Sequence, residues 1–116
     1  FDQPLREGYR KLLVVLTRPR DYVKGPMPAS VGALLRTAYR QFPSVFEGVA
    51  RRPDRYNAGR RLLFELEERG QAYVFAPDNL WINNTESRRE RLEATYRAGL
   101  VQAVREMPAI KAFLGL

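Results

Sequence analysis

One stretch of the chain approaches a catalytic motif: Pro28-Ala29-Ser30-Val31-Gly32 differs from G-x-S-x-G at a single position. In enzymes with that motif, a strand runs straight into a sharp turn that exposes a nucleophilic serine, and the glycines prevent steric clashes. Here Pro28 replaces the first glycine, and a Pro/Gly loop pattern precedes it instead of a strand. We therefore interpret Ser30 as the N-cap of a helix, where serine is common. We predict no catalytic residue in this chain.

Other reactive side-chain combinations are scarce. The sequence contains no cysteine and no histidine, which excludes disulfides, zinc sites built on these residues, cysteine nucleophiles and a Ser-His-Asp triad. Paired carboxylates for proton transfer need burial or mutual proximity to separate their pKa values. Nothing in the sequence requires either for Glu65, Glu67 and Glu68 at a helix end, or for Asp78 and Glu86 beside a loop. We predict no acid/base pair, no cofactor and no metal site.

A hydroxyl and several cations follow the first predicted strand. Thr17, Arg18 and Arg20 would lie beyond its carboxyl end, where open α/β sheets bind ligands, and they could hold a phosphate or a carboxylate. The alternative is that both arginines pair with acidic side chains across the loop. Lys24 and Trp81 complete the set of candidate contacts to an anion or a lipid headgroup. Trp81, the only tryptophan, either plugs the core or contacts a membrane interface.

Two strands must position these residues. Five consecutive aliphatic residues between Gly8 and Pro19 predict a strand over Lys11–Leu16. Because a half-buried strand would alternate apolar and polar residues, we expect this strand to be buried on both faces, as in a parallel sheet. The aromatic and β-branched stretch Ala72–Ala76, closed by Pro77, predicts the second strand. Two strands cannot bury the first on both faces, so we expect the rest of the sheet to lie outside this chain.

Helices account for most of the remaining residues. Apolar spacing, prolines and glycines predict their limits. The predicted helical segments are Phe1–Glu7 before Gly8, Ser30 to about Gln41, Ser44 to about Arg51 after Pro43, Asp54–Arg69 before Gly70, a long final helix capped by Asn84 or Thr85, and a further turn after Pro108, Ala109–Leu114, ending at Gly115. In the predicted helix after Ser30, an apolar face is expected at Val31, Leu34, Leu35, Ala38 and Tyr39. The fold class is α/β, with two strands in a mostly helical chain.

Length and composition bound the class of protein. The 116 residues, 45% apolar and 28% charged, suit one globular segment, and we treat residues 1–116 as a single segment. No signal-peptide pattern is present, and no apolar run reaches the roughly 20 residues that a membrane-spanning helix needs. We therefore expect a protein that is cytoplasmic or peripheral to a membrane. The start at Phe1 rather than Met leads us to expect a piece of a longer chain.

The net charge of +7 has two interpretations. One is attraction to nucleic acid phosphates or to an anionic membrane surface. The other is a solvated surface, because the arginines are spread through the chain and often interleaved with glutamates. Nucleic acid is the less favoured partner, since no helix-turn-helix spacing, RNP strand or zinc finger occurs.

Several stretches together resemble the carboxyl-terminal third of bacterial patatin-like phospholipases. In that family, a helix, a glycine and a strand of the form K-hydrophobic-V-V-L-T-R-P follow shortly after a D-G-G or D-G-A motif. The stretches that carry the resemblance here are Leu5–Pro19, Tyr39–Pro43 (Y-x-x-F-P), Arg52–Asn57 (R-x-x-x-Y-N), Leu66–Gly70 before the second strand, and Leu92–Gly99 (L-x-x-x-Y-x-x-G). The resemblance spans nearly the whole chain.

This resemblance implies a serine acyl hydrolase that cleaves lipid or carboxylic ester bonds with a Ser-Asp dyad. The family's glycine-rich loop, its G-x-S-x-G serine and its D-G-G aspartate lie upstream of the segment that this chain matches, so no catalytic residue is carried over. Asp2 is not that aspartate, because no glycine follows it. The chain would be the carboxyl-terminal part of an α/β/α sandwich, and its main partner would be the amino-terminal catalytic part of the same protein.

Two further hypotheses remain open. The chain could be a basic, non-enzymatic module that binds anionic lipid or nucleic acid, which predicts salt-sensitive binding. It could also dock onto a separate catalytic chain through the exposed faces of its strands. A fragment with an unpaired sheet edge is expected to self-associate.

Overall fold

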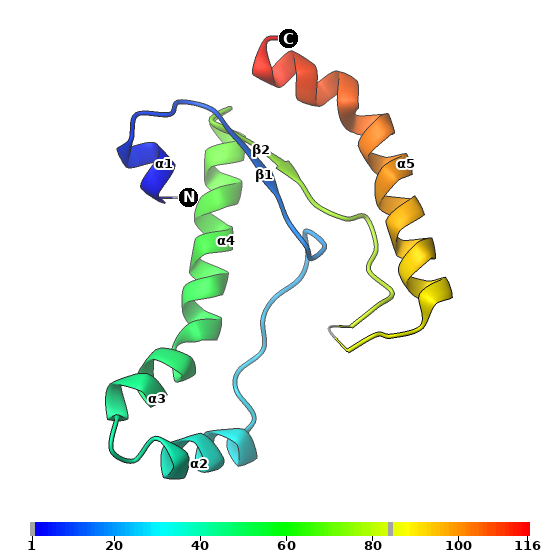
Figure 1. Ribbon diagram of the computed structural model, residues 1–116. Helices are drawn as coiled ribbons and strands as arrows, with labels where there is room; N and C mark the ends of the chain where they lie inside the picture. Colours follow the sequence, from blue (N-terminus) through cyan, green and yellow to red (C-terminus); the bar gives the residue numbers. More distant parts are fainter. Residues whose placement is uncertain (1, 84) are drawn as a thin grey trace. The chain divides into compact units, whose positions relative to one another are not determined.

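The computed structural model describes residues 2–83 and 85–116 as a mostly helical α/β chain (Figure 1). Its elements, in chain order, are α1 (Asp2–Arg6), β1 (Leu12–Val15), α2 (Ala29–Ala38), α3 (Pro43–Ala50), α4 (Arg52–Glu68), β2 (Ala72–Phe75) and α5 (Arg89–Leu114). The residues form two compact units, which we describe separately. The sheet unit joins the residues up to Tyr22 with Phe64–Leu116, and the helical unit comprises Val23–Leu63.

The sheet unit contains both strands, which run parallel with Leu12 opposite Ala72 and Val15 opposite Phe75. Both predicted strands are confirmed to within two residues, because aliphatic, β-branched and aromatic side chains suit a pleated surface. The Leu16 N–H extends the ladder by donating to the Phe75 carbonyl at 2.8 Å. Parallel strands need a long crossover, and the chain between β1 and β2 supplies one that contains three helices.

The two faces of β1 differ in burial. On one face, Leu12 and Val14 are partly buried, whereas on the other Leu13 is 42% exposed and Val15 is 65% exposed. The expectation that two strands cannot bury β1 on both faces is therefore confirmed, and its burial on both faces in a wider sheet stays a prediction. The physical reason is that β2 is the only strand beside β1 among the described residues, so too little of the chain surrounds β1.

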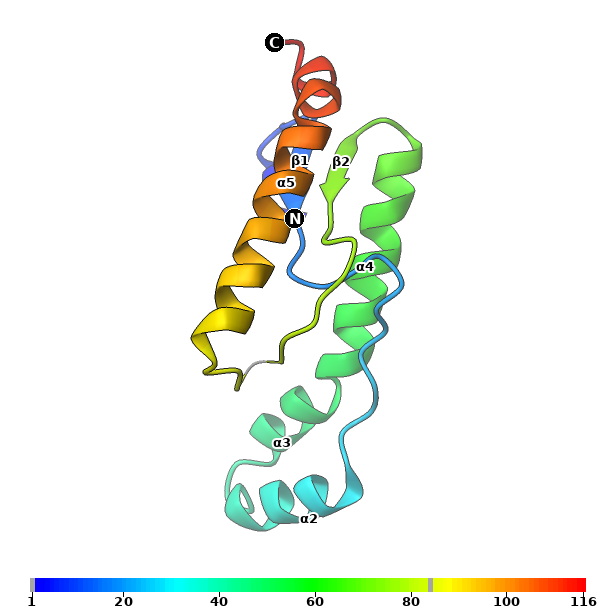
Figure 2. The ribbon, with the colours of Figure 1, turned by 90° about the vertical axis from the view of Figure 1, so that its right-hand side faces the viewer.

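Helices lie on both sides of the sheet. Figures 1 and 2 show α5 on one side of the strands and the carboxyl-terminal end of α4 on the other. Tyr73 of β2 contacts α5, with its ring centroid 5.9 Å from that of Phe113. On the opposite face, Val74 of β2 is buried, and so is Leu66 in the last turns of α4. The sheet unit therefore has helix, sheet and helix layers.

Side chains form hydrogen bonds with backbone groups on the outer edge of β2. The Val74 N–H donates to Glu67 Oε1 at 3.0 Å, and the Val74 carbonyl accepts from Arg20 at 3.2 Å. The Ala76 carbonyl just beyond the strand accepts from the Gln102 side chain at 2.7 Å. Exposed edges with free backbone groups invite pairing with further strands. These bonds occupy the outward groups of Val74 and the Ala76 carbonyl, although no partner for the outward groups of Ala72 occurs in residues 2–83 and 85–116.

The outer edge of β1 is open. In a parallel pair, the N–H and C=O groups of alternate residues point away from the partner strand. In β1 these are the groups of Leu13 and Val15, because Leu12 and Leu16 bond toward β2. No hydrogen-bond partner for these outward groups occurs in residues 2–83 and 85–116. A further strand could therefore pair with β1 without displacing any side chain, whereas a strand beside β2 would have to displace the bonds at Val74 and Ala76.

Several predicted helix limits are confirmed and one cap is wrong. Pro43 occupies the first turn of α3 as predicted, and Gly70, with φ of +70°, ends α4 in the left-handed conformation that favours glycine. Ser30 is not an N-cap, because α2 already begins at Ala29, with Pro28 as its N-cap and no side-chain cap bond. The fixed φ of proline suits the residue that enters a helix, so Pro28 took the place predicted for the serine.

Helix α5 also departs from its predicted limits. The predicted cap at Asn84 lies outside the described residues, and Thr85 is not the N-cap, since α5 has Arg88 there. The turn predicted to start after Pro108 belongs to α5, which continues through this proline to Leu114 and bends near it (Figure 1). Gly115 ends the helix as predicted, at φ +78°. None of the described helices is long and apolar enough to cross a bilayer.

The core is small and lies mainly in the sheet unit. Its buried apolar side chains there are Leu66, Ala72, Val74, Ala76 and Ile110. In the helical unit, α2 and α3 contribute no buried residue, although they contact each other. The apolar face predicted for α2 is therefore present in the sequence but not buried, with Leu34 69% exposed.

Candidate functional site

The carboxyl ends of both strands meet at one edge of the parallel sheet, where open α/β sheets bind ligands. Thr17, Arg18 and Arg20 follow β1, and Asp78 and Trp81 follow β2. All five belong to the sheet unit. The predicted anion contacts at this edge can thus be examined one by one for what each side chain touches.

Arg20 is held by the protein itself. Its guanidinium forms an ion pair with Glu67, donates to the Val74 carbonyl at 3.2 Å and lies 4.9 Å from the centre of the Phe64 ring. The hydrogen bond to Glu67 is the main reason why the pKa of Arg20 is raised above its ordinary value. For this residue the alternative of an acidic partner across the loop is confirmed, and its role is to close the β2 edge.

Thr17 and Arg18 differ in exposure. Thr17 is exposed, and the partly buried Arg18 places its guanidinium 5.2 Å from the centre of the Tyr22 ring. Such a cation–π contact contributes about 0.5–1 kcal/mol at an exposed site. It also orients the guanidinium within the loop that follows β1. Their role as anion contacts stays a prediction.

Lys24 belongs to the helical unit and is anchored there by its backbone. The Asn57 side chain accepts from the Lys24 N–H and donates to the Lys24 carbonyl, both at 2.9 Å. The Lys24 ammonium lies 5.5 Å from the centre of the Tyr56 ring. Of the predicted contact residues, it is the one that lies outside the sheet unit.

Trp81 does not plug the core, because it is 61% exposed. It borders a small hollow of about 120 Å³ between the loop after β2 and the facing side of α5. A side chain this large gains little from the hydrophobic effect when most of its surface stays in water. The residues that line the hollow are Pro77, Asp78, Asn79, Trp81, Thr95, Ala98, Gly99 and Gln102.

A buried glutamine organises the floor of this hollow. Gln102 of α5 is 6% exposed, and its carbonyl oxygen accepts from the Asp78 N–H at 3.0 Å. Its amide donates to the Ala76 carbonyl at 2.7 Å and to Glu106 at 2.8 Å. Arg105 in turn donates to the Asp78 carboxylate at 2.7 Å. Every polar group of this glutamine is used, so it fixes the backbone just after β2.

The network continues to Tyr73. The Tyr73 hydroxyl donates to Glu106 at 3.2 Å, and burial, followed by this hydrogen bond, raises the pKa of the phenol above its ordinary value. A raised pKa keeps the phenol protonated, as a donor must be. Sequence reasoning missed Gln102, Glu106 and Arg105. Polar residues four apart within an otherwise apolar stretch of a helix were the available signal.

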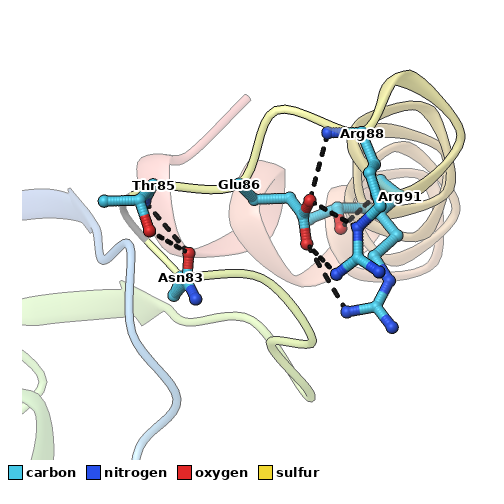
Figure 3. A network of polar contacts seen from close by, with 6 residues as sticks. Asn83, Thr85, Glu86, Arg88 and Arg91 are labelled. Carbon is cyan, nitrogen blue, oxygen red and sulfur yellow. Dashed lines mark hydrogen bonds and ion pairs between the residues drawn. The ribbon is translucent and has the colours of Figure 1, made fainter.

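A second polar cluster precedes α5, as Figure 3 shows. Asn83 accepts from the Thr85 N–H and hydroxyl at 3.0 and 2.9 Å, and the Glu86 carboxylate accepts from the Arg88 N–H at 3.1 Å. Glu86 also bridges the guanidiniums of Arg88 and Arg91 at 2.9 and 3.4 Å. Its side chain is only 6% exposed because these neighbours cover it, and Glu86 is not among the buried residues of the core.

The hydrogen bonds from Arg88 lower the pKa of Glu86 from its ordinary value to about 2. The guanidinium bonds have the largest effect, the backbone N–H the next, and the charge of Arg91 adds to them. This cluster sets where the helix begins in place of a side-chain cap. The role of this cluster is local and structural, since both oxygens of the Glu86 carboxylate already accept hydrogen bonds from the protein.

Comparison with known families decides the relationship of the chain. Residues 42–115 match the sequence model of a family described as a domain of unknown function, DUF6363. The chain belongs to the DUF6363 family. No curated protein and no solved structure matched it. The DUF6363 match includes α3, α4, β2 and α5 but not β1, so the network around Gln102 lies wholly inside it.

Two hydroxyls of the DUF6363 chain, those of Ser30 and Thr95, lack the surroundings of a nucleophile. Ser30 lies in the first turn of α2, after a loop and not after a strand, so it does not form a nucleophile elbow. In the hollow beside Trp81, the single hydroxyl, that of Thr95, donates to the Arg91 carbonyl at 2.8 Å. The hollow can accept a small polar group, but it offers no activated nucleophile.

Proposed function

We propose that this chain is the carboxyl-terminal structural segment of a patatin-like serine acyl hydrolase. The Ser-Asp dyad that cleaves lipid or carboxylic esters lies outside these residues, and the segment contributes strands and helices to the α/β/α sandwich. The resemblance of Leu5–Pro19 and the later stretches to that family suggests the parent protein. The proposal gives the chain a supporting role in the hydrolase and no catalytic residue of its own.

The observation that carries this proposal is the asymmetry of the sheet. Arg20, Glu67 and Gln102 bond outward backbone groups of Val74 and Ala76 on the β2 side, whereas the outward groups of Leu13 and Val15 in β1 have no partner within residues 2–83 and 85–116. Unpaired strand edges bind further strands readily, and two strands with a continuous aliphatic run are marginal alone. A third parallel strand beside β1 would satisfy these groups, and a wider sheet would bury the exposed side chains of Leu13 and Val15.

The experiment uses the protein encoded by the complete reading frame that contains these residues. We expect it to hydrolyse a p-nitrophenyl ester, and we expect a serine-reactive fluorophosphonate to block that activity. Substituting Val15→Arg should lower activity at least about tenfold, because it forces an unpaired charge into a buried layer. The 116-residue chain alone should not hydrolyse the ester above the buffer rate.

Val23→Arg is the matched control, because Val23 is similarly exposed, at 72%, but lies in the loop of the helical unit. It should leave the activity unchanged. A reading frame without G-x-S-x-G and a following D-G-G or D-G-A would overturn the proposal. Hydrolysis by the 116-residue chain that is abolished by Ser30→Ala would also overturn it.

The alternative of a basic binding module is favoured by a separate observation, the concentration of positive charge in the helical unit. This alternative does not require an open sheet edge. The two ideas concern different units of the chain, so each can be tested without the other.

A further inference from the structure

Positive charge is concentrated in the helical unit. Its residues, Val23–Leu63, contain eight Lys and Arg but only two Asp and Glu, a net charge of +6 out of the +7 of the whole chain. The rest of the chain contains twelve Lys and Arg and eleven Asp and Glu, a net charge of +1. A domain with this charge attracts anionic surfaces, and the attraction is screened by salt.

The same unit exposes many large apolar side chains. They extend over α2, the connection to α3, and α3 itself, and Leu34 and Phe42 are 69% and 60% exposed. Val45 and Val49 are four residues apart, so they lie on one face of α3. The exposed apolar residues of this unit are Val23, Val31, Leu34, Tyr39, Phe42, Val45, Val49 and Leu62. Large exposed apolar areas mark interaction sites.

Two arginines at the start of α4 are available for a ligand. Arg52 and Arg55 line an open hollow with Gly48 and Tyr56, and no carboxylate lies within ion-pair distance of either guanidinium in the described part of the chain. Lys24 and Arg60 both lie over the Tyr56 ring, at 5.5 and 5.9 Å from its centre. Two further cations thus lie over the ring of a residue that lines this hollow. Guanidiniums bind phosphates strongly because their donors match phosphate oxygens.

We propose that the helical unit docks on an anionic phospholipid bilayer. Arg52 and Arg55 contact the lipid phosphates, and Leu34 and Phe42 enter the boundary between headgroups and acyl chains. A bilayer offers negative charge and apolar depth at the same surface. Duplex nucleic acid would use the arginines but would leave Leu34 and Phe42 in water, so the bilayer fits both observations. The proposal does not rest on the hydrolase assignment.

Vesicle sedimentation tests this proposal with the 116-residue chain. We expect binding to phosphatidylcholine vesicles that contain phosphatidylglycerol, and little binding to phosphatidylcholine alone. Each Lys or Arg near an anionic surface contributes about fivefold to binding, so Arg52→Gln with Arg55→Gln should weaken it about 30-fold. Raising the salt concentration should reduce the difference between the wild type and this variant.

Two matched controls isolate the site. Arg10→Gln with Arg97→Gln removes the same net charge from exposed positions of the sheet unit and should change binding at most about threefold. Leu34→Ser with Phe42→Ser should weaken the part of vesicle binding that persists at high salt. Tyr96→Ser with Val101→Ser removes comparably exposed side chains from α5 and should leave that binding unchanged. Far-ultraviolet circular dichroism checks that each variant keeps its helices.

Several results would overturn the proposal. One is the absence of wild-type binding to anionic vesicles at low salt. A second is an equal loss of binding in the two arginine variants, which would indicate net charge without a site. A third is binding to duplex DNA that depends on Arg52 and Arg55 while vesicle binding does not, which would assign the unit to nucleic acid instead.

Discussion

In the sheet unit, basic and acidic residues are nearly equal in number, and many are paired, as in Arg20–Glu67 and Arg105–Asp78. In the helical unit, eight basic residues accompany two acidic ones, and Arg52 and Arg55 have no acidic partner in the described chain. Charge pairing in the first unit supports its own backbone, for example at the β2 edge. The excess charge of the second is available to a partner.

The two units also differ in how many side chains they bury. The sheet unit surrounds β2 with buried side chains, whereas α2 and α3 bury none. Burial of apolar surface is the main stabilising contribution in folding. We conclude that buried side chains stabilise the sheet unit, and that its β1 edge still lacks a neighbouring strand. In the helical unit, α2 and α3 instead leave their apolar side chains exposed.

The largest expected effect concerns the core. Leu66→Ala in the sheet unit removes a side chain that is 6% exposed and should lower the free energy of unfolding by about 2–5 kcal/mol. Leu34→Ala in the helical unit removes one that is 69% exposed and should change it by less than about 0.5 kcal/mol. Urea unfolding followed by circular dichroism measures both. Equal losses would show that the two units do not differ in burial.

A smaller effect is expected at the buried glutamine. Gln102→Leu keeps the volume but leaves the Asp78 N–H and the Ala76 carbonyl without their partner, which should cost about 1–3 kcal/mol. Gln3→Leu is the control, because Gln3 is exposed and, among the described residues, its side chain bonds Glu7 in the neighbouring turn. Urea unfolding that finds the two variants equally stable would contradict a structural role for the network around Gln102.

The smallest effect concerns pH. Because the pKa of Glu86 in the fold is about 2, below its ordinary value of 4.5, its ion pairs stabilise the fold above that ordinary value. This stabilisation should be lost as the pH falls from about 4.5 toward 2. Glu86→Gln should remove this part of the acid sensitivity and no other. An NMR titration of the Glu86 carboxyl with a midpoint near 4 would contradict the paired geometry.

Local sequence signals predicted the strands and several helix ends well. The aliphatic run before Thr17 and the stretch Ala72–Ala76 predicted strands that the structure confirms, and Gly70 and Gly115 each end a helix as expected. These features depend on side-chain shape and backbone freedom within a few residues. The helix starts were predicted less well, because Pro28 and Arg88 are the N-caps where a serine, an asparagine or a threonine was expected.

The candidate site could not be predicted in the same way, because its contacts join distant residues. Arg20 and Glu67 are 47 positions apart, and Asp78 and Gln102 are 24 apart. A sequence pattern gives the type of each residue but not its neighbour across the fold. That is why Arg20 was a candidate ligand contact before the structure assigned it to the β2 edge, and why a place in the core was one of two alternatives for Trp81.

By itself, the amino-acid sequence determined the two strands, the helical content, the positive charge and the absence of cysteine and histidine chemistry. Propensity, periodicity and composition are properties of the chain alone. Only the tertiary structure decided that Gln102 is buried, that side chains bond Val74 and Ala76 at the β2 edge, and that the β1 edge has no partner in the part of the chain that the structure describes. These outcomes depend on which backbone groups find partners, and that is settled only when distant segments pack together.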